Sequence, residues 1–160
     1  MSPRGRIAAA ALVFLAIVVC ACGGMPSSTA PTQALNVSGS WSGTSSDSQG
    51  VTVVEWTLVQ NGTTVTGTVR TNAPDPTDGS CNSCHRNKSG TVTGTVSGTQ
   101  LGMTMTFAAG VDGDPTPICS ATMTGTAALN ASAGVGGAYT GSDTCEGAFL
   151  NGNLTMTRHR

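Results

Sequence analysis

The feature that most constrains the fold is an alternation of apolar residues with threonine or serine, which runs through almost the whole chain from Val37 onward. Side chains at every second position share one face of a strand, so this period predicts half-buried β-strands and no helix. We predict about eight strands, over residues 37–44, 51–60, 63–71, 90–97, 100–109, 118–127, 136–145 and 153–158. Short turns between consecutive strands favour an all-β, up-and-down antiparallel meander.

Two-residue turns set the expected register of three hairpins. The turns are Asn61-Gly62, Gly98-Thr99 and Asn151-Gly152. They place Trp56 opposite Gly67, Gly94 opposite Met103, and Gly147 opposite Met156. A bulky side chain facing a glycine is how a tightly curved sheet makes room inside, so we predict that the meander closes into a small barrel. The threonines, Thr52 and Thr57 among them, are expected on the outer face.

The first and last predicted strands carry a tryptophan and an arginine of matching inward parity. Gly39-Ser40-Trp41 lies on the first strand and Arg158 on the last. This pattern resembles the calycin group, the lipocalins and avidins, in which a Gly-x-Trp motif packs against an arginine of the last strand. The resemblance implies a closed barrel over residues 36–160, a cation–π contact between Trp41 and Arg158, and a ligand cavity that opens at the end with the longer loops.

That long-loop end is expected to comprise the segments 45–50, 72–89 and 110–117. By the same resemblance, it is the mouth of a cavity for a small apolar ligand. The residues expected to line the interior are Trp56, Met103, Met105, Phe107, Tyr139 and Asp143, and those expected around the opening are Cys81, Cys84, His85, Arg86, Lys88, Asp112 and Asp114. The alternative is a filled barrel that acts as a structural or protein-interaction module.

The N-terminus has the organisation of an export signal. Arg4 and Arg6 precede a short apolar run, and the segment Val19-Cys20-Ala21-Cys22 follows it. This segment resembles a bacterial lipobox, which implies that residues 1–21 are removed and that Cys22 is acylated. Residues 22–35 are rich in Ser, Thr, Pro and Ala, which suits a tether between the membrane and the barrel. Gly23 after the cysteine, rather than Asp, resembles the signal for the outer membrane in Gram-negative cells.

Four further cysteines form an even set, which favours disulfides in an exported domain. If the hairpin between the sixth and seventh strands turns near Ser132, Cys119 lies opposite Cys145. A disulfide is therefore predicted there, with a local clasp between Cys81 and Cys84. The segment Cys81-Asn82-Ser83-Cys84-His85 also matches the attachment pattern of c-type haem, and the same side chains could hold a metal ion.

Charge is sparse, with 7 Lys and Arg residues against 8 Asp and Glu. This balance gives no basic footprint for nucleic acid. The titratable candidates for catalysis are few, namely Glu55, His85, Asp143, Glu146 and His159, and the chain has no nucleophile elbow or phosphate loop. We therefore expect a monomeric protein that is not an enzyme and needs no cofactor.

Overall fold

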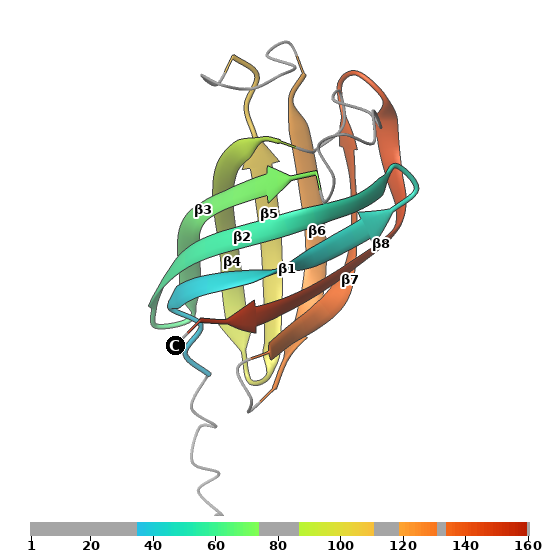
Figure 1. Cartoon of the computed structure of the whole chain (residues 1–160). Helices are drawn as coiled ribbons and strands as arrows, with labels where there is room; N and C mark the ends of the chain where they lie inside the picture. The colour runs from blue at the N-terminus through green and yellow to red at the C-terminus, as the bar shows by residue number, and fades with distance from the viewer. Residues whose placement is uncertain (1–34, 74–86, 111–118, 131–133, 160) are drawn as a thin grey trace, which may run out of the picture. The chain divides into compact units, whose positions relative to one another are not determined.

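The computed structural model describes residues 35–73, 87–110, 119–130 and 134–159. Its eight strands are β1 (Gly39–Asp47), β2 (Gly50–Asn61), β3 (Thr64–Asn72), β4 (Ser89–Ser97), β5 (Gln100–Phe107), β6 (Ala121–Leu129), β7 (Gly134–Asp143) and β8 (Gly147–Arg158). Each strand pairs antiparallel with the next, and β8 pairs with β1 (Figure 1). The predicted all-β meander and its closure into a small calycin-like barrel are confirmed.

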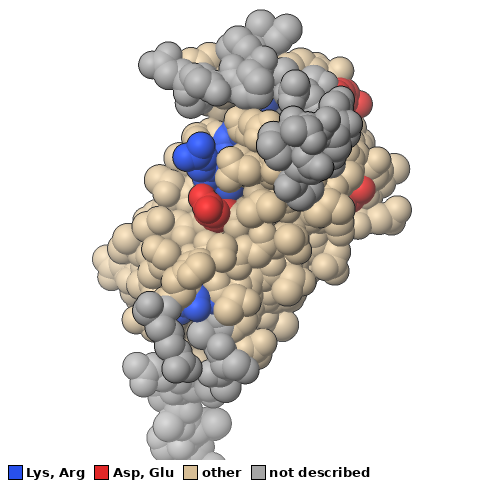
Figure 2. Space-filling view, in the orientation of Figure 1, with Lys and Arg blue, Asp and Glu red and all other residues tan. Residues whose placement is uncertain are grey.

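Because apolar and polar residues alternate in the sequence, the apolar side chains point into the barrel and most of the polar ones point outward. Apolar residues of all eight strands form one buried cluster inside the barrel. Threonines such as Thr68, Thr91 and Thr122 are exposed outside, and Figure 2 shows few charged atoms on this face. The expectation for Thr52 is wrong: it is fully buried, because it shares the inward parity of Val54 and Trp56 on β2.

The β4–β5 hairpin has the predicted register, with Gly94 opposite Met103. The β2–β3 register is wrong by two residues, since the strands pair through Asn61 and Thr64 and turn at Gly62-Thr63. Trp56 therefore lies opposite Val69 and not opposite Gly67. A slip of two residues preserves the side-chain parity, so the inward and outward faces are unaffected.

The predicted hairpin at Asn151-Gly152 is wrong. Both residues lie within β8, and the chain turns between Asp143 and Gly147 instead. Asn151 has a φ of 58°, and the register of β7 against β8 shifts between Tyr139 and Gly141. The bulge places Asn151 in a left-handed conformation, which asparagine tolerates better than most residues. The same dipeptide that favours a turn is therefore accommodated here in a bulge.

Glycines on the inner face allow the sheet to curve sharply. A Cβ atom built on Gly43, Gly67, Gly125, Gly137 or Gly141 would overlap a backbone carbonyl oxygen of a neighbouring strand. The pairing between strands is also strongly staggered. A path from Gly39 on β1 through register partners around the sheet reaches Phe149 near the start of β8. Trp41, only two residues further along β1, pairs directly with Arg158 at the end of β8. Such stagger accompanies tilted strands in closed barrels.

The two ends of the barrel are built differently. The closure end is defined by the start of β1 and the end of β8, and the β2–β3 and β4–β5 turns lie beside it with the C-terminus (Figure 1). The opposite, mouth end carries the β1–β2 and β7–β8 turns. The prediction of a long loop over residues 45–50 is wrong. β1 and β2 pair as far as Asp47 and Gly50, so only Ser48 and Gln49 lie between the two strands.

Candidate functional site

All six side chains predicted to line the interior lie inside the barrel. Each is at most 5% exposed, and the apolar five belong to the continuous core; they are Trp56, Met103, Met105, Phe107, Tyr139 and Asp143. Four inward methionines contribute to this core, two of which, Met105 and Met123, are register partners. Methionine is flexible and fills irregular space, so this interior can adapt its packing.

Tyr139 reaches from β7 across β8 to β1. Its register partner on β8 is Gly152, where a Cβ atom would lie 2.6 Å from carbon atoms of the tyrosine ring. The glycine therefore lets the ring pass over β8. The Tyr139 hydroxyl donates a hydrogen bond of 2.6 Å to Oδ2 of Asp47, whose Oδ1 accepts one of 2.8 Å from the backbone N–H of Gln49.

Two buried hydroxyls lie near this hydrogen bond. Ser45 and Thr52 are register partners on β1 and β2, exposed by 1% and 0%. Thr52 Oγ1 has no hydrogen-bond partner in the part of the chain that the structure describes, whereas the Ser45 hydroxyl lies close enough to the Tyr139 phenol to affect its pKa. Leaving a buried polar group unpaired costs about 1 to 3 kcal/mol. We call Ser45, Asp47, Thr52 and Tyr139 the β1–β2 polar cluster.

The environment of Tyr139 favours its neutral form. Burial raises the pKa of the Tyr139 phenol well above its ordinary value, and the hydrogen bond to Asp47 raises that pKa further. The nearby Ser45 hydroxyl opposes this shift to a smaller extent. The cluster thus contains a carboxylate, a neutral phenol and two hydroxyls.

Alkaline titration is expected to report on this cluster, since Tyr139 is the only tyrosine of the chain. The pKa of Tyr139 is higher in the folded state than in the unfolded state, so the buried neutral phenol contributes to the free energy of unfolding. This contribution is fully present below the ordinary pKa of 10.0 and is lost as the pH rises above it. Near-ultraviolet absorbance should show tyrosinate near pH 10 in denaturant and only at clearly higher pH in the folded protein. A single titration common to both states would contradict the buried hydrogen bond. Tyr139→Phe should remove the signal and this part of the pH dependence.

Asp143 organises the turn that follows β7. Its Oδ1 accepts hydrogen bonds from the backbone N–H groups of Cys145, at 2.8 Å, and Glu146, at 2.5 Å. Its Oδ2 is buried with no hydrogen-bond partner among the described residues. Asp143 is therefore in part a structural residue of the mouth end and not only a lining residue.

Lys88 is a buried cation that the sequence prediction placed at the opening. It is 1% exposed, and its Nζ donates a 3.0 Å hydrogen bond to the carbonyl oxygen of Cys119. The backbone of Lys88 is also bonded to Thr71. The parity that points Val92 inward on β4 extends back to Lys88, and this signal could have identified it as an inward residue.

The predicted disulfide between Cys119 and Cys145 is confirmed, with 5.6 Å between the Cα atoms. Hydrogen bonds between Ser120 and Thr144 hold the same two segments together. The remaining predicted residues lie outside the described part of the chain: Cys22, Cys81, Cys84, His85, Arg86, Asp112 and Asp114. Acylation, the clasp and the haem and metal alternatives remain predictions.

The closure end is held by the tryptophan and arginine that carried the family resemblance. Trp41 and Arg158 are register partners, and the guanidinium carbon lies 6.0 Å from the centre of the indole ring. Arg158 also donates hydrogen bonds to the carbonyl oxygens of Asn36 and Ser38. The indole Nε1 donates a 2.8 Å hydrogen bond to the carbonyl oxygen of Val37. These contacts tie the last strand to the segment that leads into the first.

Arg158→Ala is expected to lower the free energy of unfolding by roughly 1 to 3 kcal/mol, since it removes the stack and leaves backbone acceptors unpaired. Urea denaturation should show the loss as a lower midpoint. An unchanged midpoint would mean that the contact does not stabilise closure. Arg70→Ala on the exposed wall is the control, and it should move the midpoint far less.

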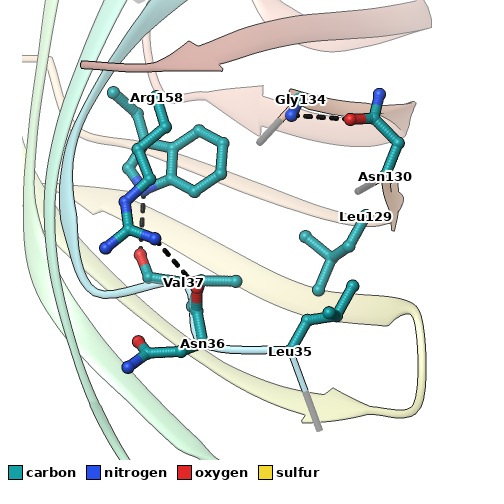
Figure 3. Close-up of a pocket in the computed structure, with 8 residues that line it drawn as sticks. Leu35, Asn36, Val37, Leu129, Asn130, Gly134 and Arg158 are labelled. Atoms are coloured by element: carbon teal, nitrogen blue, oxygen red, sulfur yellow. Dashed lines mark hydrogen bonds between the residues drawn. The ribbon is translucent and has the colours of Figure 1, made fainter. Parts of the chain in front are cut away.

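A pocket of about 200 Å³ lies beside this contact (Figure 3). Its walls come from the segment before β1, the ends of β6 and β8 and the start of β7, and its lining residues are Leu35, Asn36, Val37, Trp41, Leu129, Asn130, Gly134 and Arg158. The pocket combines an indole and aliphatic side chains with an amide and a guanidinium. It was not predicted from the sequence, because the β6–β7 connection and the segment before β1 meet only in the closed barrel.

Within the described ranges, no group of three or more His, Cys, Asp and Glu side chains is placed to hold a metal ion. The same ranges contain no helix long and apolar enough to cross a membrane. No protein-family model matches this chain, and no curated protein matches its sequence. Fold and site together define a closed eight-stranded antiparallel barrel with a buried polar cluster near one end.

Proposed function

We propose that this chain is a lipid-anchored protein of the bacterial cell envelope whose barrel binds a small molecule toward its mouth end. The observation that carries the binding proposal is the buried hydroxyl of Thr52, which lies opposite the buried Ser45 and has no hydrogen-bond partner among the described residues. Buried polar groups nearly always have a hydrogen-bond partner, so the Thr52 hydroxyl favours a bound molecule that supplies one.

The chemistry of the cluster narrows the ligand class. A hydroxyl both donates and accepts hydrogen bonds, so the Ser45 and Thr52 side chains suit a neutral carbonyl or hydroxyl group. The Asp47 carboxylate disfavours an anionic head group. The adaptable methionines of the core would accommodate an apolar body. The ligand is therefore a small neutral amphiphile, which refines the expectation of a purely apolar one.

Native mass spectrometry of the protein, extracted under mild conditions, tests this proposal. We expect a bound mass that is lost in the Ser45→Ala/Thr52→Val variant. The matched control is Ser46→Ala/Thr57→Val, which makes the same chemical changes on exposed positions of the same two strands and should retain the ligand. A protein with no bound mass, or a mass retained by both variants, would contradict the proposed site.

A second candidate is a filled barrel that acts as a structural or protein-interaction module, which the continuous apolar core favours. The same variants separate the two. In a filled barrel, replacing a buried hydroxyl that lacks a partner by an apolar group of similar shape is neutral or stabilising. A higher unfolding midpoint of Ser45→Ala/Thr52→Val, without loss of any bound mass, would support the filled barrel.

The anchor has its own test. Cys22→Ala should move the protein from the membrane pellet to the soluble fraction or leave it with an uncleaved leader, because Cys22 is the residue that is acylated and becomes the new N-terminus after cleavage. Cys20→Ala is the matched control, since Cys20 belongs to the leader that processing removes. If Cys22→Ala stays processed and membrane-bound, the lipid anchor is refuted.

A further inference from the structure

The pocket at the closure end is lined by one positively charged side chain and by no carboxylate of the described residues. Arg158 lines it, and the hydrogen bonds of its guanidinium go to two backbone carbonyls, with no carboxylate partner among the described residues. The described carboxylates lie elsewhere: Asp47, Asp143 and Glu146 toward the mouth end, and Glu55 on the outer wall opposite Arg70. A guanidinium has five N–H donors, so the two bonds leave donors for an anion.

The pocket lies close in sequence to the proposed lipid anchor. Leu35 lines the pocket, and only residues 23–34 separate it from Cys22, which is proposed to carry the lipid. Even fully extended, these residues span at most about 45 Å. A connection of this length limits the distance of the closure end from the lipid anchor and allows the pocket to reach the bilayer surface.

We propose that this pocket binds the head group of an anionic phospholipid in the membrane that anchors the protein. The Arg158 guanidinium pairs with the lipid phosphate, and the Trp41 indole with Leu35 and Leu129 covers the adjoining glycerol and methylene groups. The volume of about 200 Å³ is that of roughly six or seven water molecules in the liquid, which suits a head-group region and not a whole acyl chain. This inference rests on the lipid anchor of the proposed function.

Fluorescence quenching by brominated lipids tests the inference. The protein as cells process it, with Trp56→Phe so that Trp41 is the only tryptophan, is reconstituted into vesicles of phosphatidylcholine and phosphatidylglycerol. Bromine is placed near the head-group end of either the anionic or the neutral lipid, while the composition is held constant. We expect clearly stronger quenching when the anionic lipid carries the bromine. Equal quenching in the two preparations would overturn the inference.

Two variants locate the effect. Arg158→Gln should remove the preference for the anionic lipid, and Arg70→Gln, which removes the same charge from the outer wall, should retain it. Because Arg158→Gln can destabilise the barrel, Leu35→Glu provides an independent test at an exposed position. Its carboxylate at the rim should also abolish the preference while the circular dichroism spectrum stays that of the parent. If Leu35→Glu keeps the preference, the pocket is not the lipid site.

Sedimentation with the vesicles distinguishes this inference from the anchor. A protein that fails to sediment with them refutes the anchor, and the inference falls with it. A protein that sediments but shows no lipid preference refutes the inference and leaves the anchor intact.

Discussion

Gly137→Ala is expected to unfold at a much lower urea concentration than the parent, with a loss of roughly 3 kcal/mol or more. The added methyl group would point into the barrel, where it would overlap the carbonyl oxygen of Thr126 and lie 2.5 Å from the Cα atom of Ala127. These are backbone atoms of β6, so no side chain can rotate away to relieve the contact.

The neighbouring glycine provides the control. Gly136 is exposed, and the nearest atom to a Cβ built there is the Leu154 carbonyl oxygen at 3.9 Å. Gly136→Ala should therefore leave the unfolding midpoint unchanged or raise it slightly, because alanine lowers the entropy of the unfolded chain. If both substitutions destabilised equally, a general loss of glycine and not inward crowding would explain the result.

Removal of the Cys119–Cys145 disulfide is the second large effect. The bridge closes a sequence separation of 26 residues, for which the loop-entropy model gives about 3.5 kcal/mol of stabilisation. The Cys119→Ala/Cys145→Ala variant should lose this amount in urea denaturation under oxidising conditions. The parent should approach the variant when its disulfide is reduced.

The Cys81→Ser/Cys84→Ser variant serves as the comparison, since a clasp across so short a loop adds little to global stability. The larger bridge is supported by the hydrogen bonds between Ser120 and Thr144. If the two double variants were equally stable, those hydrogen bonds alone would be sufficient to hold the mouth end of β6 and β7.

The fold could be predicted because apolar and polar residues alternate with a period of two, which only strands satisfy. The error in the β2–β3 register left each side chain on its predicted face of the sheet. The predicted β2–β3 register was wrong by two residues because Asn61-Gly62 and Gly62-Thr63 are both compatible with a tight turn. The local sequence does not decide between these two turns. The Asn151-Gly152 error has another origin. A conformation with positive φ serves turns and bulges alike, and only the length of the paired partner distinguishes them.

The site was predictable to the extent that parity decides it. The inward positions of Trp56, Met105 and Phe107 follow from alternation alone. The hydrogen bond between Tyr139 and Asp47 does not, because it crosses an intervening strand and depends on the open surface over Gly152. The burial of Lys88 was missed because a charge next to a polar segment is usually solvated, although its parity pointed inward.

The pairing of β1 with β8 also governs when the barrel can fold. These strands join the two extremes of the described chain, so their contacts have a very large separation in sequence and form late and slowly. Until β8 arrives, β1 presents an unpaired edge that can template aggregation. A chain synthesised from its N-terminus therefore cannot complete the barrel until β8 has been made, and β1 stays unpaired on one edge until then.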